Sequence, residues 1–179
     1  MGSITHSDFL VTLLKNRVHT IGCEVGVHTG ATSVVVLKAL PKIKKYHAVD
    51  PWESYKTYDG TLYRKPGNKL YKNWSQAKQA FIRRTSPYKK TVIHQKTSVD
   101  AVKKFKDGSL DWIFIDANHE YEYIKENLLL WTPKVKKGGL VSGHDYGNKW
   151  KGIKKAVDEF VPADILNVNP ECYVWWYIK

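Results

Sequence analysis

The chain has 179 residues, of which 42% are hydrophobic and 13% aromatic, and its formal net charge at pH 7 is +12. This length and composition predict one domain over residues 1–179 with a sizeable core, and they exclude an intrinsically disordered chain. No run of about 18 apolar residues is present, which excludes a membrane-spanning helix, and the first residues lack the basic-then-apolar layout of a secretory signal.

Strand-like and helix-like segments alternate along the N-terminal half. Ser7 is expected to cap a first helix, because a hydroxyl there can accept hydrogen bonds from free backbone N–H groups. Residues 51–68 are rich in aromatic side chains, have no clear period and are expected to form a long loop. The other expected elements are a strand over 19–25, a largely apolar helix over 31–40, a strand over 46–50 and an amphipathic helix over 70–84.

The alternation continues to the C-terminus and ends in two strands joined by a short link. Expected strands cover 91–95, 110–116, 140–142, 164–168 and 173–178, and expected helices cover 99–105, the segment around 121–131, and 153–161. The pattern predicts an α/β fold, a Rossmann-like three-layer sandwich with a mostly parallel seven-stranded sheet. Its C-terminal antiparallel hairpin contributes the one reversed strand.

The stretch over residues 22–30 predicts the first strand-turn-helix of a nucleotide-binding domain. Gly26 and Gly30 let the backbone bend and let a ligand approach the main chain. Glu24 ends the strand, where an acid suits a cation such as an ammonium or sulfonium. The dinucleotide fingerprint Gly-x-Gly-x-x-Gly is absent, because His28 occupies the place of its middle glycine. A tight turn without a ligand is the alternative.

Polar residues follow the other strands, and the carboxyl ends of parallel strands share one edge of the sheet. Asp50 can accept both hydroxyl protons of a ribose there, with a plain loop acid as the alternative. Trp52 can cover an adenine face or can equally be a core residue beneath the loop. The expected edge set is Glu24, Asp50, Thr97, Ser98, Asp116, His119, His144 and Asp145.

Two short polar segments form the expected chemical centre. Asp116 and Asp145, with His144, can hold a hard divalent ion and leave open positions for substrate oxygens. His119 can take a proton from a hydroxyl bound near that ion. The alternatives are that Asp116 caps the next helix and that His144 is a satisfied core histidine. The joint placement of these residues beside the glycine turn favours the functional interpretation.

Taken together, the chain resembles the class I S-adenosylmethionine-dependent methyltransferases over nearly its whole length. Within that class it looks like the small metal-dependent O-methyltransferases of the catechol and macrolide-sugar types. Each matching piece is weak, but the combination is specific. The matching pieces are residues 24–30, Asp50, 96–100, 114–119 with Tyr121, 138–140 and 144–146.

The resemblance implies S-adenosyl-L-methionine as the cofactor. It places Glu24, Gly26 and Gly30 at the methionine part, with Thr32 near the methionine carboxylate. It places Asp50 at the ribose and Ser98 at the adenine. The whole implied contact set is Glu24, Gly26, His28, Gly30, Thr32, Asp50, Trp52, Ser98 and Asp116.

The resemblance also assigns roles to the residues of the expected chemical centre. Asp116 corresponds to a metal ligand, and His144 and Asp145 fall where the remaining ligands lie. His119 stands where such enzymes carry a lysine or histidine base. Histidine is a poor Mg²⁺ ligand, so His144 leaves open whether the ion is Mg²⁺ or another divalent metal. His28 departs from the usual glycine and can crowd the cofactor.

The expected reaction is methyl transfer to a hydroxyl on a small molecule or sugar, with His119 as the general base. Aromatic residues of the loop over 52–63, with Tyr146 and Trp150, would cover the acceptor. The chain has little beyond this domain, so further acceptor specificity must come from the loop or from a partner subunit of a homo-oligomer. Cys23 and Cys172 are expected to be buried free thiols, which favours a reducing, cytoplasmic location.

Other functions stay open. The net charge of +12 suits a nucleic-acid methyltransferase, which would need a contiguous basic track beside the pocket. A solvated lysine surface is favoured, because the excess is scattered lysine and arginine is the better phosphate ligand. An NAD-type oxidoreductase or a non-catalytic nucleotide-binding module is the last alternative. The Gly-x-x-x-Gly spacing and the terminal hairpin argue against the oxidoreductase.

Overall fold

The computed structural model describes residues 4–15, 20–57, 60–63 and 71–179. Its main sheet has seven strands in the order β5-β2-β1-β6-β7-β9-β8. Neighbouring strands are parallel except that β9 runs against both β7 and β8, so β9 is the one reversed strand. The strands are β1 (Ile21–Val25), β2 (Lys45–Val49), β5 (Thr91–His94), β6 (Leu110–Ile115), β7 (Val135–Gly143), β8 (Asn167–Asn169) and β9 (Val174–Ile178).

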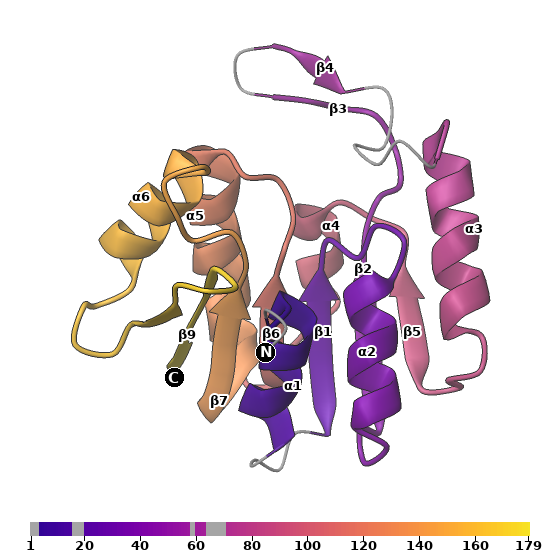
Figure 1. The fold of residues 1–179 in the computed structure, drawn as a ribbon, viewed down its shortest axis with the longest axis horizontal. Coiled ribbons are helices and arrows are strands. Elements are labelled where there is room, and N and C mark those ends of the chain that lie inside the picture. The colour runs from indigo at the N-terminus through magenta and orange to yellow at the C-terminus, as the bar shows by residue number, and fades with distance from the viewer. Residues whose placement is uncertain (1–3, 16–19, 58–59, 64–70) are drawn as a thin grey trace.

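Helices cover both faces of this sheet and make three layers (Figure 1). One face carries α1 (His6–Lys15), α2 (Ala31–Ala39) and α3 (Trp74–Thr85). The other carries α4 (Ser98–Val102), α5 (Tyr121–Trp131) and α6 (Lys151–Phe160), and a 3-10 turn, η1 (Thr132–Lys134), follows α5. The predicted fold class, with its C-terminal antiparallel hairpin, is confirmed.

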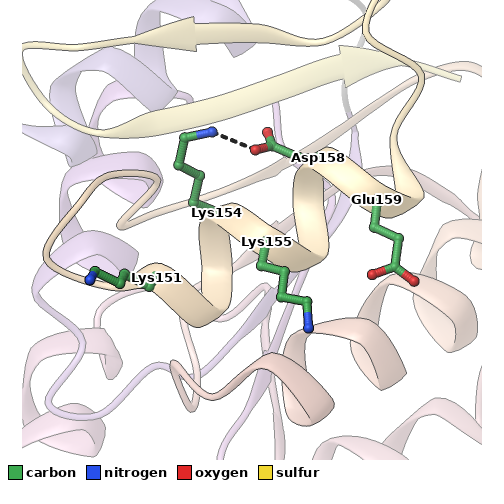
Figure 2. Close-up of a pocket in the computed structure, with 5 residues that line it drawn as sticks. All are labelled: Lys151, Lys154, Lys155, Asp158 and Glu159. Carbon is green, nitrogen blue, oxygen red and sulfur yellow. Dashed lines mark hydrogen bonds and ion pairs between the residues drawn. The ribbon is translucent and has the colours of Figure 1, made fainter.

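The amphipathic pattern of α6 shows how the helices attach to the sheet. Ile153, Ala156 and Val157 are buried, whereas the opposite side carries charge. That outer side borders an open hollow of about 470 Å³ lined by Lys151, Lys154, Lys155, Asp158 and Glu159 (Figure 2). Lys154 pairs with Asp158, so the charge on this surface is mixed.

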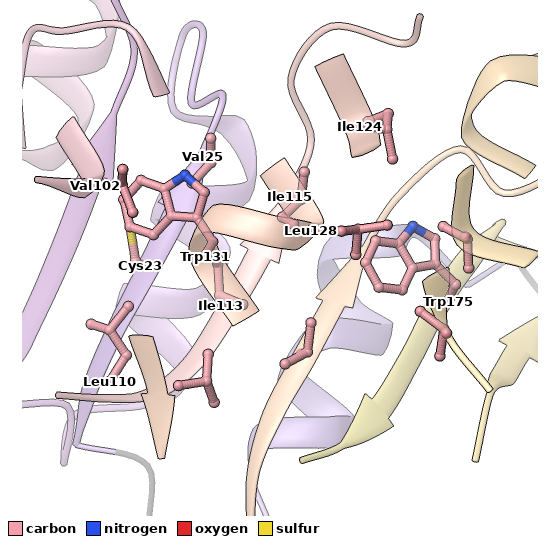
Figure 3. Close-up of a cluster of buried hydrophobic side chains, with 14 of the residues drawn as sticks. Cys23, Val25, Val102, Leu110, Ile113, Ile115, Ile124, Leu128, Trp131 and Trp175 are labelled. Carbon is pink, nitrogen blue, oxygen red and sulfur yellow. The ribbon is translucent and has the colours of Figure 1, made fainter. Parts of the chain in front are cut away.

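Two hydrophobic cores lie on the two faces of the sheet, because side chains alternate along each strand. Trp112 and Phe114 of β6 point to the core beneath α1, α2 and α3. Ile113 and Ile115 point to the core beneath α4, α5 and α6, which also holds Trp131 (Figure 3). All six residues of β6 are buried, as expected for a central strand that is covered on both faces.

Three local predictions need correction. Ser7 lies inside α1 and does not cap it; Thr5 does, since its Oγ1 accepts the backbone N–H of Asp8 at 3.1 Å. The expected loop contains a hairpin of β3 (Tyr55–Lys56) and β4 (Leu62–Tyr63), which projects beyond the rest of the molecule (Figure 1). The helix expected from residue 70 begins at Trp74, because Asn73 caps it through the N–H of Gln76.

Some expectations fall on parts of the chain that are not described. Residues 58–59 and 64–70 of the expected aromatic loop and helix start lie outside the described residues. Cys23 and Cys172 are buried free thiols, as predicted. Among the helices of the described residues, none has the length and apolar character needed to cross a bilayer.

Candidate active site

The turn between β1 and α2 lies at the carboxyl edge of the sheet. Gly26 and Gly30 have φ values of 89° and 79°, in the left-handed region that favours glycine. A Cβ on Gly26 would lie 2.1 Å from the carbonyl oxygen of Asp116, and one on Gly30 would lie 2.8 Å from the Phe81 ring. The positive φ values agree with the predicted bend, and the protein's own atoms already require both glycines. The approach of a ligand to this turn stays a prediction.

Glu24 does not present a negative charge at this edge. Its side chain is 2% exposed and accepts hydrogen bonds from the hydroxyls of Ser33 and Tyr46. Burial raises the pKa of Glu24 to about 8, so the neutral acid predominates at pH 7. The carboxyl group therefore packs between β1, β2 and α2 and does not face outward as an anion; its contact with the cofactor stays a prediction.

Asp50 and Trp52 hold the turn in place. The carboxylate of Asp50 accepts the backbone N–H of His28 at Oδ2 and that of Trp52 at Oδ1, both at 2.8 Å. Trp52 is 5% exposed, packs on the Phe81 ring and donates its indole N–H to the carbonyl of His28 at 2.6 Å. Of the two interpretations of Trp52, the structure therefore favours the core residue over the adenine cover.

The hydroxyls of Thr32 and Ser98 also have partners within the chain. Thr32 Oγ1 lies 3.0 Å from His6 Nε2 and 3.0 Å from Ser7 Oγ, so it faces α1. Ser98 Oγ donates to Asn127 and accepts the indole N–H of Trp131, which ties α4 to α5. Cofactor contacts through these two side chains would compete with hydrogen bonds that already exist.

Polar atoms without a partner gather near the same turn. His28 Nε2, Trp74 Nε1 and Asn118 Nδ2 are buried, and none has a hydrogen-bond partner among the described residues. The rings of His28 and Trp74 lie 6.4 Å apart. Because buried polar groups are normally hydrogen-bonded, these atoms favour a polar ligand above the turn. Thr91 Oγ1 and Trp112 Nε1 are similarly unpaired, but they lie within strands.

The predicted polar centre, which consists of Asp116, His119, His144 and Asp145, lies at the ends of β6 and β7. His119 Nε2 lies 2.9 Å from Asp145 Oδ2. His144 Nδ1 lies 3.6 Å from Asp116 Oδ1 and 3.5 Å from Asp145 Oδ1. These four side chains are 17% to 32% exposed, so they are partly withdrawn from water and still within reach of a substrate.

The electrostatics of the centre follow from these contacts. Burial lowers the pKa of His144, but the close contact with Asp116 and the charges of Asp116 and Asp145 outweigh it and raise the pKa above its ordinary value. Burial raises the pKa of Asp145, but the hydrogen bond from His119 and the charge of His144 outweigh it and lower the pKa below its ordinary value. The ring of His119 stacks on Trp150 at a centroid distance of 4.2 Å, which fixes its plane.

A fifth residue, His6, joins this centre and was missed from the sequence. Its ring lies 4.1 Å from that of His144, measured between centroids. Metal-ligating atoms of His6, Asp116 and His144 lie within 4.8 Å of one another, as do those of Asp116, His119 and Asp145. A single histidine in the first turn of an amphipathic helix gives no signal in the sequence, because only the packing of α1 brings it to the edge.

Comparison with known proteins identifies the family. The sequence profile of a family described as a methyltransferase domain matches residues 23–146, from β1 through the polar centre. The chain belongs to this methyltransferase family. A comparison of the sequence with functionally curated proteins gives no match.

Solved methyltransferase structures share the fold at low sequence identity. An O-methyltransferase from Bacillus cereus in complex with SAH is 13% identical, with a TM-score of 0.64, covering 100% of this chain and 83% of that one. The O-methyltransferase of tomaymycin synthesis from Streptomyces achromogenes, in complex with SAM, is 14% identical, with a TM-score of 0.65 and coverage of 97% and 79%. A calicheamicin methyltransferase is 16% identical, with a TM-score of 0.67 and coverage of 96% and 76%.

Proposed function

We propose that this methyltransferase, as a single domain over residues 1–179, transfers the methyl group of S-adenosyl-L-methionine to a hydroxyl of a small molecule or sugar. The observation that carries the proposal is the His119–Asp145 pair at 2.9 Å, beside Asp116 at the carboxyl edge of a methyltransferase fold. Similar folds come from O-methyltransferases in complex with SAH or SAM. A further one is a TDP-rhamnose 3'-O-methyltransferase.

The cofactor would bind above the turn over residues 26–30. Asp50 fixes the shape of that turn and has lone pairs beyond its two backbone hydrogen bonds, which can accept from the ribose. The unpaired Nε2 of His28 and Nδ2 of Asn118 are available for polar groups of the cofactor. Glu24 would support the turn from beneath as a neutral group, and Ser98 and Thr32 would act through the segments that they hold.

The reaction requires a nucleophilic oxygen aligned with the sulfonium methyl group. When bound, S-adenosyl-L-methionine would supply the electrophilic methyl group to the acceptor oxygen, and its sulfur would leave as a neutral thioether. His119 takes the hydroxyl proton at Nδ1, because its Nε2 is held by Asp145. The negative charge of Asp145 stabilises the imidazolium that forms.

A divalent ion fits the donor set at this centre. Asp116, Asp145 and His144 would hold it, since carboxylate oxygens and an imidazole nitrogen are common ligands of divalent metals. When bound, the ion would lower the pKa of the acceptor hydroxyl. The backbone of Asp116 packs directly against Gly26 and donates its N–H to the carbonyl of Val25 at 2.8 Å, so this candidate ligand adjoins the cofactor turn.

Cofactor binding is tested by calorimetric titration of the full chain with S-adenosyl-L-methionine. We expect the wild type to bind and Asp50→Ala to lose measurable binding, because this change removes both the ribose acceptor and the two hydrogen bonds that shape the turn. Lys155→Ala, on the outer side of α6, is the control and should bind like the wild type. Wild-type protein that does not bind, or Asp50→Ala protein that binds equally well, would contradict the proposal.

The role of His119 is tested with an acceptor identified by SAH release. Catechols and TDP-rhamnose are suitable first probes. We expect His119→Ala to lower kcat by about 10²- to 10⁴-fold, the usual contribution of a general base, with an unchanged Kd for the cofactor. An unchanged kcat would remove His119 from the mechanism.

A nucleic-acid acceptor is the weaker candidate. It requires a contiguous basic track beside the pocket. On the outer side of α6, two acids stand among the five residues that line the hollow, and Lys154 is paired with Asp158. This mixed charge supports a solvated surface, and we propose the small acceptor in preference.

A further inference from the structure

His6 brings the N-terminal helix into the polar centre. The family match begins at residue 23, so nothing in the family assignment accounts for a histidine on α1. The helix packs against α2, and its first residue thereby lies over the end of β6, beside His144 and Phe114. A residue outside the matched segment is thus placed at the carboxyl edge of the sheet by the packing of α1.

The donor atoms around His6 meet the geometric requirement for a metal site. Ligating atoms of His6, Asp116 and His144 lie within 4.8 Å of one another. Together they offer two imidazole nitrogens and one carboxylate oxygen. Asp145 adds a second carboxylate, whose Oδ1 is 3.5 Å from His144 Nδ1. All of these groups are partly buried and still reach solvent.

Both imidazoles also have hydrogen-bond partners outside the candidate ligand set. His6 Nε2 contacts the hydroxyl of Thr32 at 3.0 Å, and Thr32 in turn contacts Ser7 at 3.0 Å. Thr32 and Ser7 are 5% and 6% exposed, so this chain of contacts is buried. His144 bonds to the backbone of Cys172. Partners of this kind orient the ring and fix the tautomer of a metal-ligating histidine.

We propose that His6 is a ligand in a transition-metal centre made of His6, Asp116 and His144, with Asp145 adjoining. The contact with Thr32 leaves Nδ1 of His6 for the ion. Two imidazoles and carboxylate oxygens suit Mn²⁺, Fe²⁺, Co²⁺ or Zn²⁺, whereas Mg²⁺ prefers oxygen ligands alone. The role of the ion in the reaction rests on the proposed function, but its binding does not.

The test is titration of the metal-free full chain with Co²⁺ alone, followed by visible absorption, and with Mg²⁺ by calorimetry. We expect His6→Ala to weaken Co²⁺ binding by at least about 100-fold, because removing a ligand costs more than removing a partner that orients it, and to leave Mg²⁺ binding nearly unchanged. The decisive quantity is the ratio of Co²⁺ affinity to Mg²⁺ affinity, which should fall in His6→Ala. A preference of the wild type for Co²⁺ is not enough, because most mixed nitrogen and oxygen sites prefer transition ions to some degree. Thr32→Val should weaken Co²⁺ binding about tenfold, because it frees the His6 ring from its partner.

His94→Ala is the matched control. His94 and His47 form a separate histidine pair, with their nitrogens 2.8 Å apart, where Co²⁺ could bind adventitiously. The control should leave the Co²⁺ spectrum unchanged. His6→Asn, a smaller polar replacement, guards against a folding defect, and thermal unfolding of each variant is measured beside the titration.

The proposal is overturned if the wild type does not bind Co²⁺, or if both His6 variants bind Co²⁺ as tightly as the wild type. It is also overturned if the signal disappears in His94→Ala. Titration with S-adenosyl-L-methionine is scored separately. If the protein binds Co²⁺ through His6 but does not bind the cofactor, the proposed function is refuted and the proposal of the metal centre still holds.

Discussion

Gly26→Ala is expected to lower the free energy of unfolding by about 3 kcal/mol, as the sum of two costs. A left-handed backbone costs an L-residue about 1–2 kcal/mol, and overpacking costs about 1–3 kcal/mol more. The second cost arises because the new Cβ would lie 2.1 Å from the backbone oxygen of Asp116, which cannot rotate away as a side chain can. Urea unfolding measures the loss.

Gly138→Ala separates the two costs. Gly138 has a φ of 78°, close to the 89° of Gly26, but apart from its chain neighbours no atom of the described residues lies within 4 Å of its Cβ position. The control should therefore lose only the backbone part, about 1–2 kcal/mol. Equal losses in the two variants would show that the close approach of the β1 turn to Asp116 does not constrain the fold. We also expect the folded fraction of Gly26→Ala to bind metal and cofactor poorly, since Asp116 must shift.

The second large expected effect is on the pH dependence of the free energy of unfolding, through Glu24. Burial raises its pKa from an ordinary 4.5 to about 8, so the folded protein holds a proton that the unfolded chain releases between these pH values. The contribution of Glu24 to stability is therefore complete below about pH 4.5 and is lost as pH rises toward 8. Glutamine keeps an acceptor for Ser33 and Tyr46 but does not titrate.

We expect Glu24→Gln to become more stable relative to the wild type as pH rises, by on the order of 2–4 kcal/mol between pH 5 and pH 8. Urea unfolding of both proteins across that range gives the difference. Glu171→Gln, at an exposed position, is the control and should follow the wild-type profile. Parallel profiles for the wild type and Glu24→Gln would mean that Glu24 is ionised in the folded protein.

The position of the candidate site, at the carboxyl edge of the sheet, could be predicted from local patterns. Strands and helices alternate with clear periods, so the ends of β1, β2, β6 and β7 could be placed in the sequence. Asp116, His119, His144 and Asp145 follow two neighbouring strands of a parallel sheet, and such ends meet at one edge. The distances among these four residues agree with that expectation.

The states of the individual side chains could not be predicted in this way. Glu24 lies at the end of a strand much as Asp116 follows one, yet burial raises its pKa to about 8, although the hydrogen bonds from Ser33 and Tyr46 act in the opposite direction. Trp52 is a core residue because Phe81 of α3 lies beneath it. Each outcome depends on a partner in another element of the fold, and a local sequence pattern does not identify that partner.

The sequence by itself determined the fold class and the strand ends that carry the polar residues, since these depend on periodicity and spacing. Its motif residues, from the Gly26–Gly30 turn to Asp145, carried the resemblance to methyltransferases. Only the tertiary structure decided which of those residues face inward and which remain accessible. It also added His6, whose place depends on the docking of α1 against α2. Packing between distant segments sets burial, and burial sets charge, so the chemistry of this edge follows from contacts that no local pattern encodes.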